Sequence, residues 1–489
     1  MKKTLCMLLL SALLLSALAA CGETPPPASD GTAAAVTSEA PAETTAATDP
    51  VAEAFAAAAG LDFEGSDFVL LYYSNALSSS WVGIPTDMNP EEETGDVLND
   101  AVYRRNRTVE EAVNVVISEL PQKGIDAVPK AVTASVMAGD EAYDLVFQSI
   151  WSIMPMTTAG LLTDFMTLDV DLGAPWYDHK SVAEMTISGR IYSLCSDITY
   201  IDKLATIVTY FNKSFADDYS LRDYYAAVLD GSWTFDAMLE DAEKVVRDVD
   251  GDGAMGIEDV YGISCQNAGG YYFSHAAGVR VCTGSGDSLR LAIRDEKFIS
   301  VLTRVIALMH SDLYFNTQTY NLNNITNLRH FASDKALFLV RPAQSLFGLR
   351  EMTSDFGIIP MPRYDENSDY IAPMNIYPGV MLCVPKSADT GMKAAVMTLL
   401  AAESHAGVMP VLYDVVLDTK ITRDTTSAAM LDIIFGSRVY DIGLICDLGG
   451  IRHPMDTGEE YEVASTIAAL ADKAQSDLDT LLATVASLP

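Results

Sequence analysis

Continuous apolar runs alternate with helical patterns along residues 60–150. The runs at 68–73 (FVLLYY) and 143–147 (YDLVF) indicate strands buried on both faces, with a shorter strand at 114–117 between them. Apolar residues at helical spacing fill the two intervals between these strands. An order of strand, helix, strand, helix, strand predicts a parallel sheet whose strands are joined by crossover helices.

The rest of the chain continues this mixture of strands and helices. Residues 205–211 (ATIVTYF) form another apolar run, and further strands are indicated at 336–340 and 380–384. A helix is expected to begin after Thr234, a good N-cap, with Trp233 at the first position of a hydrophobic staple. The chain therefore belongs to the α/β class, and its length beyond the N-terminal segments suits two domains.

The segment DVDGDGAMGIEDVYG, residues 248–262, has the spacing of an EF-hand calcium loop, with carboxylates at positions 1, 3, 5 and 12 and glycine at position 6. Gly253 permits the sharp turn, and Asp259 stands where glutamate is usual, which shortens the reach of that ligand. The predicted ligands are Asp248, Asp250, Asp252, the carbonyl of Ala254, and Asp259. A strand pattern follows in place of a second helix, so a bound calcium ion would be structural.

The N-terminus has the pattern of a secretion signal. Lys2 and Lys3 precede an apolar run at residues 8–18, which is too short to span a bilayer. The ending Leu-Ala-Ala-Cys resembles a bacterial lipobox, which predicts a signal peptide at 1–20 and a lipid on Cys21. Membrane attachment would then be through that lipid.

Residues 21–60 are rich in alanine, threonine, proline, glutamate and serine, with almost no large apolar side chains. Such a tract buries too little surface to offset the entropy of ordering. We predict a disordered tether that holds the folded part away from the membrane.

The formal net charge of −36 makes nucleic acid an unlikely partner, because an acidic surface repels polyanions. Five cysteines remain after Cys6 and Cys21, an odd number without Cys-x-x-Cys spacing, so buried thiols are expected. The six histidines lack metalloprotease spacing, and there is no Gly-x-Ser-x-Gly or Walker-type loop. These observations argue against the common hydrolase and nucleotidase classes.

Several motifs in order resemble those of one family. They are the lipobox, EETGDVLNDAVYRRNRTVEE, AYDLVF, PWYD, GSWTFD, DVDGDGAMGIEDVYG, DFGIIPMPRYDEN, and the run AAES, MLDIIF and RVYDIG. The chain from about residue 62 to its end is similar to extracellular solute-binding protein family 1, the carbohydrate-type, lipid-anchored receptors of bacterial ABC transporters.

The resemblance implies a two-lobed, periplasmic-binding-protein-like α/β fold with a ligand cleft between the lobes. The first lobe is expected at 61–195 and 342–375 and the second at 205–340 and 386–489. The crossings between them are expected near 196–204, 341 and 376–385.

The ligand-contacting residues are expected in loops after strands and in the crossings, because ligands of parallel sheets sit beyond the carboxyl ends of the strands. Sugars present apolar C–H faces and hydroxyl groups, so aromatic rings and hydrogen-bonding side chains are the candidates. The predicted contacts are Trp81, Gln148, Trp151, Trp176, Asp197 and Tyr377.

The expected function is that of a monomeric, extracellular, lipid-anchored binding protein. It would close on a carbohydrate, most simply an oligosaccharide, and deliver it to the transmembrane subunits of an ABC permease. Two alternatives stay open: a receptor of the same fold for a peptide or another solute, and a calcium-dependent surface glycoside hydrolase. Paired carboxylates for the latter exist among 67 acidic residues, but no feature singles out a pair.

Overall fold

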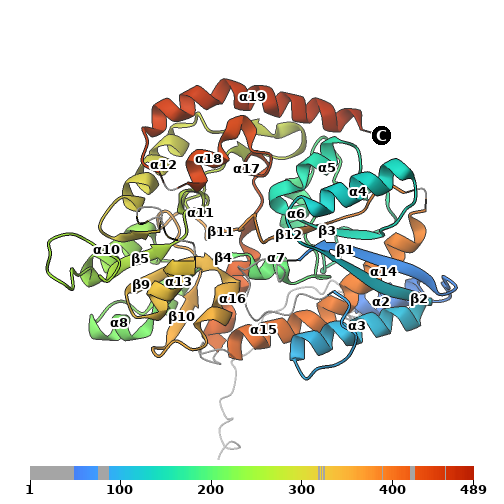
Figure 1. Ribbon diagram of the computed structural model, residues 1–489, viewed down its shortest axis with the longest axis horizontal. Helices are drawn as coiled ribbons and strands as arrows, with labels where there is room; N and C mark the ends of the chain where they lie inside the picture. The colour runs from blue at the N-terminus through green and yellow to red at the C-terminus, as the bar shows by residue number, and fades with distance from the viewer. Residues whose placement is uncertain are drawn as a thin grey trace, which may run out of the picture. The chain divides into compact units, whose positions relative to one another are not determined.

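Figure 1 shows the computed structural model of the chain. It describes residues 49–74, 88–317, 320, 322, 325–387, 389–418, 425–457 and 459–488, which all belong to one compact unit, Thr48–Pro489. Cys21, predicted to carry a lipid, the predicted signal peptide at 1–20 and the ligand candidate Trp81 lie outside the described residues.

The first sheet has four strands in the order β12-β3-β1-β2. Its strands are β1 (Ser66–Tyr73), β2 (Val115–Gln122), β3 (Leu145–Ser149) and β12 (Val380–Cys383). β1 runs parallel to β2 and β3, whereas β12 is antiparallel to β3. The crossover helices are α3 (Val97–Val113), which begins at the N-cap Asp96, and α4 (Ala127–Ala138). The predicted parallel unit is therefore present, with an antiparallel strand from the distant C-terminal part at its edge.

The second sheet has five strands in the order β10-β4-β9-β5-β8. These are β4 (Ile207–Asn212), β5 (Tyr261–Cys265), β8 (Tyr314–Asn316), β9 (Ala336–Pro342) and β10 (Phe356–Ile359). β5 is parallel to β8 and β9, and β4 is antiparallel to β9 and β10. Helix α10 (Phe235–Val245) packs on β5 and β9 and begins as predicted, with Thr234 accepting a hydrogen bond from the amide of Ala237.

Trp233 is fully buried, and its indole N–H donates to the carbonyl of Pro360 at 3.0 Å. Its structural role agrees with the staple position that the sequence gives it. The remaining described helices include α5 (Met154–Thr158), α6 (His179–Met185), α8 (Lys213–Asp218), α9 (Tyr224–Asp230), α11 (Gly269–Ala276), α12 (Glu296–Met309) and α13 (Ile325–Ala332).

Two short elements and one helix connect the parts that carry the sheets. Helix α7 (Ile201–Leu204) leads from the first sheet's region into β4. Returning toward β12, the chain passes through β11 (Ala372–Pro373), which pairs with β13 (Arg438–Val439). The C-terminal part comprises α16 (Thr425–Gly436), α17 (Ile442–Ile445), α18 (Arg452–Asp456) and α19 (Val463–Ser487), and α19 contacts both α12 and α5 (Figure 1).

The structure corrects the predicted boundaries in three places. The segment 342–375 was assigned to the first lobe, but β10 pairs with β4 of the second sheet, so the chain does not cross at 341. The segment 386–489 was assigned to the second lobe, but α14 (Gly391–Glu403) packs on α3 of the first. The proposed crossing 376–385 contains β12, a strand of the first sheet. Such pairings join residues that are 144 to 237 positions apart, and local pattern carries no signal for them.

The tether predicted at 21–60 is wrong for its last part, residues 49–60, and its earlier part lies outside the described residues. Helix α2 (Pro50–Ala57) begins at Asp49, whose carboxylate accepts a hydrogen bond from Val51, with proline at the first helical position. Phe55 is partly buried against the core, and α2 packs on α14. The few apolar residues of this stretch are enough to hold α2 in the fold, because α14 provides the surface against which they pack.

One stretch among the described residues, Gly391–Val416, is long and apolar enough to cross a membrane by length and composition alone. Within its most apolar window 56% of the residues are buried inside the molecule. It comprises α14, the π-helical turn Ser404–Val408 and most of α15 (Met409–Asp418), and its parts pack on α2 and α3. These contacts are those of a core helix.

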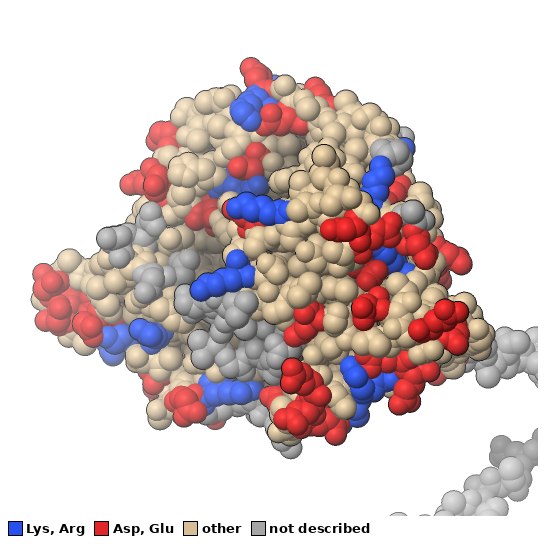
Figure 2. All heavy atoms as spheres, turned by 45° about the vertical axis from the view of Figure 1, so that its right-hand side comes forward, with Lys and Arg blue, Asp and Glu red and all other residues tan. Residues whose placement is uncertain are grey.

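The acidic composition is visible on the surface. In Figure 2 aspartate and glutamate side chains form several patches on the face turned to the viewer, with lysine and arginine more sparsely placed between them. A surface of this sign repels polyanions.

Candidate functional site

The carboxyl edge of the first sheet brings three separate segments together. β1 and β3 end at this edge, and β12 begins there because it runs antiparallel to β3. The register pairs Tyr72 with Phe147 and Val380 with Ser149. Trp151, directly after β3, and Tyr377, directly before β12, therefore lie side by side.

The rings of Trp151 and Tyr377 stack on each other. Their centroids are 4.2 Å apart and their planes differ by 21°. The Ser149 hydroxyl donates to the carbonyl of Tyr377 at 2.8 Å, which ties the segment before β12 to the end of β3. At Gly379 a Cβ would lie 2.8 Å from the Asn375 carbonyl and 3.0 Å from the Ile150 side chain, so this close approach requires glycine.

A guanidinium group from α18 covers Trp151 as well. The Arg452 guanidinium carbon is 3.7 Å from the centroid of the Trp151 ring, a close cation–π contact. Arg452 also donates to the carbonyls of Trp151 at 3.3 Å and Ile445 at 3.2 Å. Burial lowers the pKa of Arg452, and Asp447 opposes that shift. We call Tyr377, Trp151 and the Arg452 guanidinium the aromatic stack.

Helix α18 is held in place by its contact with α11 of the second sheet's region. A Cβ at Gly270 of α11 would collide with the carbonyl of Met455, so the two backbones approach as only glycine allows. The aromatic stack therefore joins a loop of the first sheet, a segment that crosses between the sheets, and a helix on the side of the second sheet.

Asp456 closes the far end of the stack. The Tyr377 hydroxyl donates to its carboxylate. Burial raises the pKa of Asp456 to about 6, partly offset by Tyr377 and Arg452. Burial and then Asp456 likewise raise the pKa of Tyr377, so the tyrosine remains a neutral donor. The group offers aromatic surface, a cation and a carboxyl within one small volume.

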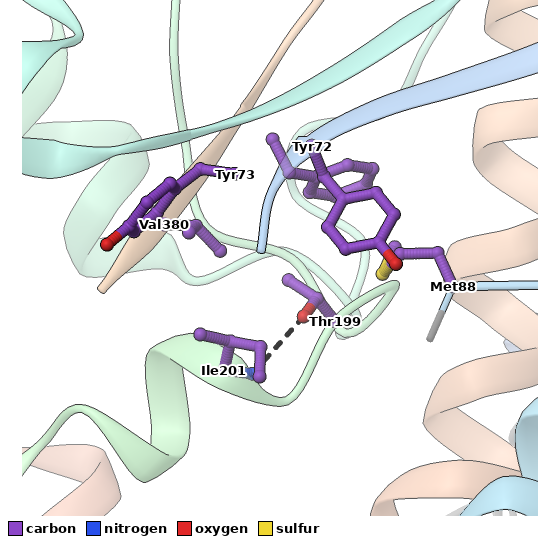
Figure 3. Close-up of a pocket in the computed structure, with 7 residues that line it drawn as sticks. Tyr72, Tyr73, Met88, Thr199, Ile201 and Val380 are labelled. Carbon is purple, nitrogen blue, oxygen red and sulfur yellow. Dashed lines mark hydrogen bonds between the residues drawn. The ribbon is translucent and has the colours of Figure 1, made fainter. Parts of the chain in front are cut away.

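A pocket lies at the same edge, shown in Figure 3. It is lined by Tyr72, Tyr73, Met88, Phe147, Thr199, Ile201 and Val380, and its cavity volume is about 10 Å³, about what one water molecule needs. In Figure 3 the rings of Tyr72 and Tyr73 extend to different sides, while Thr199 accepts a hydrogen bond from the Ile201 amide at 3.2 Å. Small-molecule pockets usually measure roughly 300–1,000 Å³. In this conformation the pocket is therefore too small for a sugar.

The structure places the other predicted ligand contacts away from the stack. Gln148 is fully buried, and its amide donates to the Ile125 carbonyl at 2.8 Å and to Ser152. Trp176 is also buried, in edge contact with Tyr177. The Gln148 amide nitrogen is thus partnered in the interior, whereas its amide oxygen and the Trp176 indole N–H are buried without a hydrogen-bond partner among the described residues.

Asp197 belongs to a buried ion network, by which we mean Asp178, Asp197, Asp202, Lys203 and Arg438. Lys203 pairs with Asp197 at 2.7 Å and with Asp202 at 3.3 Å, and Arg438 pairs with Asp202 at 2.8 Å and with Asp178. Burial by itself raises the pKa of Asp197, but Lys203 and His405 together more than offset this, and the pKa lies below its usual value. The Asp197 carboxylate is already paired with the Lys203 ammonium, so a ligand would have to compete with this ion pair.

The acidic loop has part of the predicted metal geometry. Ligand atoms of Asp248, Asp250 and Asp252 lie within 4.8 Å of one another. Gly253 adopts φ +85°, and its amide donates to Asp248 at 2.9 Å. Asp259 differs in being buried; its two oxygens accept hydrogen bonds from the amides of Val249 and Gly256, as those of Asp248 do from Gly251 and Gly253. Three predicted side-chain ligands thus converge, and the fourth is used to close the loop.

Sequence reasoning missed Arg452 and Asp456. They lie in IRHPMD, residues 451–456, a short stretch without periodicity or a recognisable motif. Tyr73 was part of a predicted strand but not of the predicted site. Its position as the last residue of β1 was the available signal, because strand ends in parallel sheets point to the ligand side.

Comparison with known proteins gives structural likeness only. No family model matches the sequence, and no curated protein matches it. The fold is similar to that of a cyclo/maltodextrin-binding protein complexed with maltotetraose, at TM-score 0.57 and 14% identity over 85% of this chain and 98% of the other. UgpB from Mycobacterium tuberculosis, in complex with glycerophosphocholine, aligns at TM-score 0.56 and 16% identity over 85% and 99%.

A third similar structure is the maltose-binding periplasmic protein MalE from Listeria monocytogenes in complex with maltose. It aligns at TM-score 0.54 and 14% identity over 85% of this chain and 98% of the other. These are binding proteins, and the likeness covers nearly their whole length. The predicted fold class, a two-lobed periplasmic-binding-protein-like α/β fold with a cleft, is confirmed.

Proposed function

We propose that this chain is an extracellular substrate-binding protein of an ABC importer, of the carbohydrate-type solute-binding family, and that its ligand is a carbohydrate. The observation that carries the proposal is the aromatic edge of the first sheet. Trp151 and Tyr377 come from two segments and stack beside Arg452 of α18, and Tyr73 lines the pocket at the same edge. The similar structures solved with maltotetraose and maltose support a sugar as ligand.

Aromatic rings suit sugars because a pyranose presents an apolar face of C–H groups. Hiding that surface from water contributes roughly 25 cal/mol per Å². The carboxyl group of Asp456 and the carbonyls near Arg452 would accept hydrogen bonds from hydroxyl groups at the rim of the ring. The region thus combines the two kinds of contact that a sugar needs.

Capture would proceed by closure of the two sheet-bearing parts about the segments around α7 and β11. The closed form would then dock on the permease. We further propose that Cys21 carries a lipid that keeps the protein at the outer face of the cytoplasmic membrane, and that the protein acts as a monomer. Cys21→Ala should move the protein from the membrane fraction to the medium or leave it unprocessed, whereas unchanged attachment would contradict the anchor.

The ligand proposal is tested by calorimetry of the soluble protein with mono- and oligosaccharides. Trp151→Ala should weaken binding by about 2 kcal/mol, the scale of a buried aromatic anchor. Tyr103→Ala is the matched control, because this half-buried tyrosine lies on α3 under Arg107, away from the edge. No heat with any sugar would contradict the proposal, and recovery of cleaved sugar would favour a glycoside hydrolase.

We also propose that the acidic loop 248–259 holds a structural calcium ion. Carboxylate oxygens are the ligands that calcium prefers, and Asp248, Asp250 and Asp252 already converge around the turn at Gly253. These three fit the ion. Asp259 fits less well, since it is buried and does not belong to the group of converging carboxylates. The carbonyl of Ala254 and water would complete the shell.

A further inference from the structure

Both faces of Trp151 are occupied by other groups of the same chain. Tyr377, nearly parallel at 4.2 Å, covers one face of the indole. The Arg452 guanidinium carbon is 3.7 Å from the centroid of the ring and has room only on the opposite face. A sugar cannot stack on Trp151 until one of these two neighbours leaves.

Tyr377 is the less movable neighbour. Its hydroxyl donates to Asp456, and its backbone carbonyl accepts a hydrogen bond from Ser149. It stands two residues before Gly379, where the backbone is packed against Asn375 and Ile150. Displacing the ring would break these contacts together.

Arg452 is held more loosely. Its guanidinium donates to two neutral carbonyls, of Trp151 and Ile445, and its Nε makes no hydrogen bond with any residue that the structure describes. The partly exposed carboxylate of Asp447 forms a long ion pair with that Nε at 3.8 Å, beyond hydrogen-bond distance, and the same oxygen accepts a hydrogen bond from the Arg452 backbone amide at 2.9 Å. A small rotation away from the indole would shorten this ion pair to a hydrogen bond, so the guanidinium has a second position in which its charge is better paired.

We infer that Arg452 is a specificity-determining gate, whose guanidinium occupies the face of Trp151 on which the ligand stacks. This rests on the proposed function, since it assumes a carbohydrate as ligand. Binding exchanges the cation–π contact for the sugar and moves the guanidinium to Asp447. The face that is uncovered is bordered by the carbonyls of Trp151 and Ile445, both hydrogen-bond acceptors. The site then selects ligands that present hydroxyl donors around an apolar ring face.

The gate predicts opposite effects for its two partners. Arg452→Ala removes the competitor and should tighten binding of a sugar identified in the calorimetric panel by about two- to thirtyfold, the range of a cation–π contact. Asp447→Asn removes the alternative partner of the guanidinium. It should weaken binding about two- to fivefold, as expected for loss of a partly exposed ion pair. Asp447→Asn should have no effect in the Arg452→Ala background.

A chemical test separates the gate from a merely structural role. Millimolar methylguanidinium should refill the vacated face in Arg452→Ala and weaken sugar binding again, while leaving the wild type unchanged. Arg304→Ala is the matched control, because Arg304 also lies over an aromatic ring, Phe235 at 4.6 Å, but on α12. It should alter neither the affinity nor the response to methylguanidinium. If Arg452→Ala does not fold, as judged by its thermal unfolding, Arg452→Gln replaces it.

The outcomes distinguish this inference from the proposed function. Tighter binding by Arg452→Ala, reversed by methylguanidinium, supports the gate. If sugars bind the wild type but bind Arg452→Ala equally or less well, the gate is wrong and the proposed function stands. If no sugar of the panel binds either variant, the proposed function fails and the gate fails with it.

Discussion

The buried ion network and the aromatic stack both join segments that are far apart in the chain, but they balance charge in different ways. In the network every charged group lies within an ion pair, such as Arg438 between Asp178 and Asp202. In the stack the Arg452 guanidinium rests on an indole and two carbonyls with only a long ion pair to Asp447 at 3.8 Å, and Asp456 accepts from a tyrosine hydroxyl. The charges of the network are thus paired at short range, whereas the cation of the stack is not. We expect the first to hold the fold and the second to respond to a ligand.

The largest expected effect is on the network. Arg438→Met leaves Asp178 and Asp202 buried without that cation, and breaking a buried pair typically costs about 3–5 kcal/mol. Urea unfolding should show this loss of stability. A loss below about 1 kcal/mol would mean that the network is solvated like a surface ion pair. The expected difference between the network and the aromatic stack would then be wrong.

The stack should make stability depend on pH. The pKa of Asp456 is raised to about 6 from 3.8, so its contribution to stability is fully present below pH 4 and is lost as the pH rises through 6. The change is at most about 3 kcal/mol, at about 1.4 kcal/mol for each unit of pKa shift. Asp456→Asn should reduce the difference in unfolding free energy between pH 4.5 and pH 7.5. An unaltered difference would assign the pH dependence to other groups.

The acidic loop 248–259 is a third charged cluster to compare, and it contains no lysine or arginine. If it holds calcium, the ion at one hundred times its dissociation constant should add about 2.7 kcal/mol to the free energy of unfolding. Asp250→Ala should abolish that gain, because it removes a ligand from the converging trio. Thermal unfolding with calcium and with chelator measures both, and equal melting temperatures for the wild type would show that the loop holds no ion.

The smallest expected loss of stability is that from removing an exposed ion pair. Arg294, in the turn before α12, and Asp472, on α19, form an exposed ion pair. Arg294→Ala should cost no more than about 1 kcal/mol, because solvent and salt screen such a pair. A larger loss in urea unfolding would show that attachment of α19 matters more to stability than its surface charges suggest.

The sequence by itself determined the features that depend on neighbours along the chain. The strands at the start of the first sheet, the N-cap Thr234, the buried Trp233 and the turn of the acidic loop all follow from local spacing and capping chemistry. The α/β class follows from the order of these elements. The ligands Asp248, Asp250 and Asp252 could be named because they lie within five residues of one another.

Only the tertiary structure decided how distant segments meet. Tyr377 reaches Trp151 because β12 joins β3 in antiparallel register, and Arg452 reaches it because Gly270 lets α18 approach α11. Asp197 was predicted as a ligand contact, yet its carboxylate forms an ion pair with Lys203 and contacts a ring nitrogen of His405 at 2.7 Å. The physical reason is the same in each case. Local patterns fix which face of an element is apolar, but the partner of that face is chosen by packing and charge across hundreds of residues.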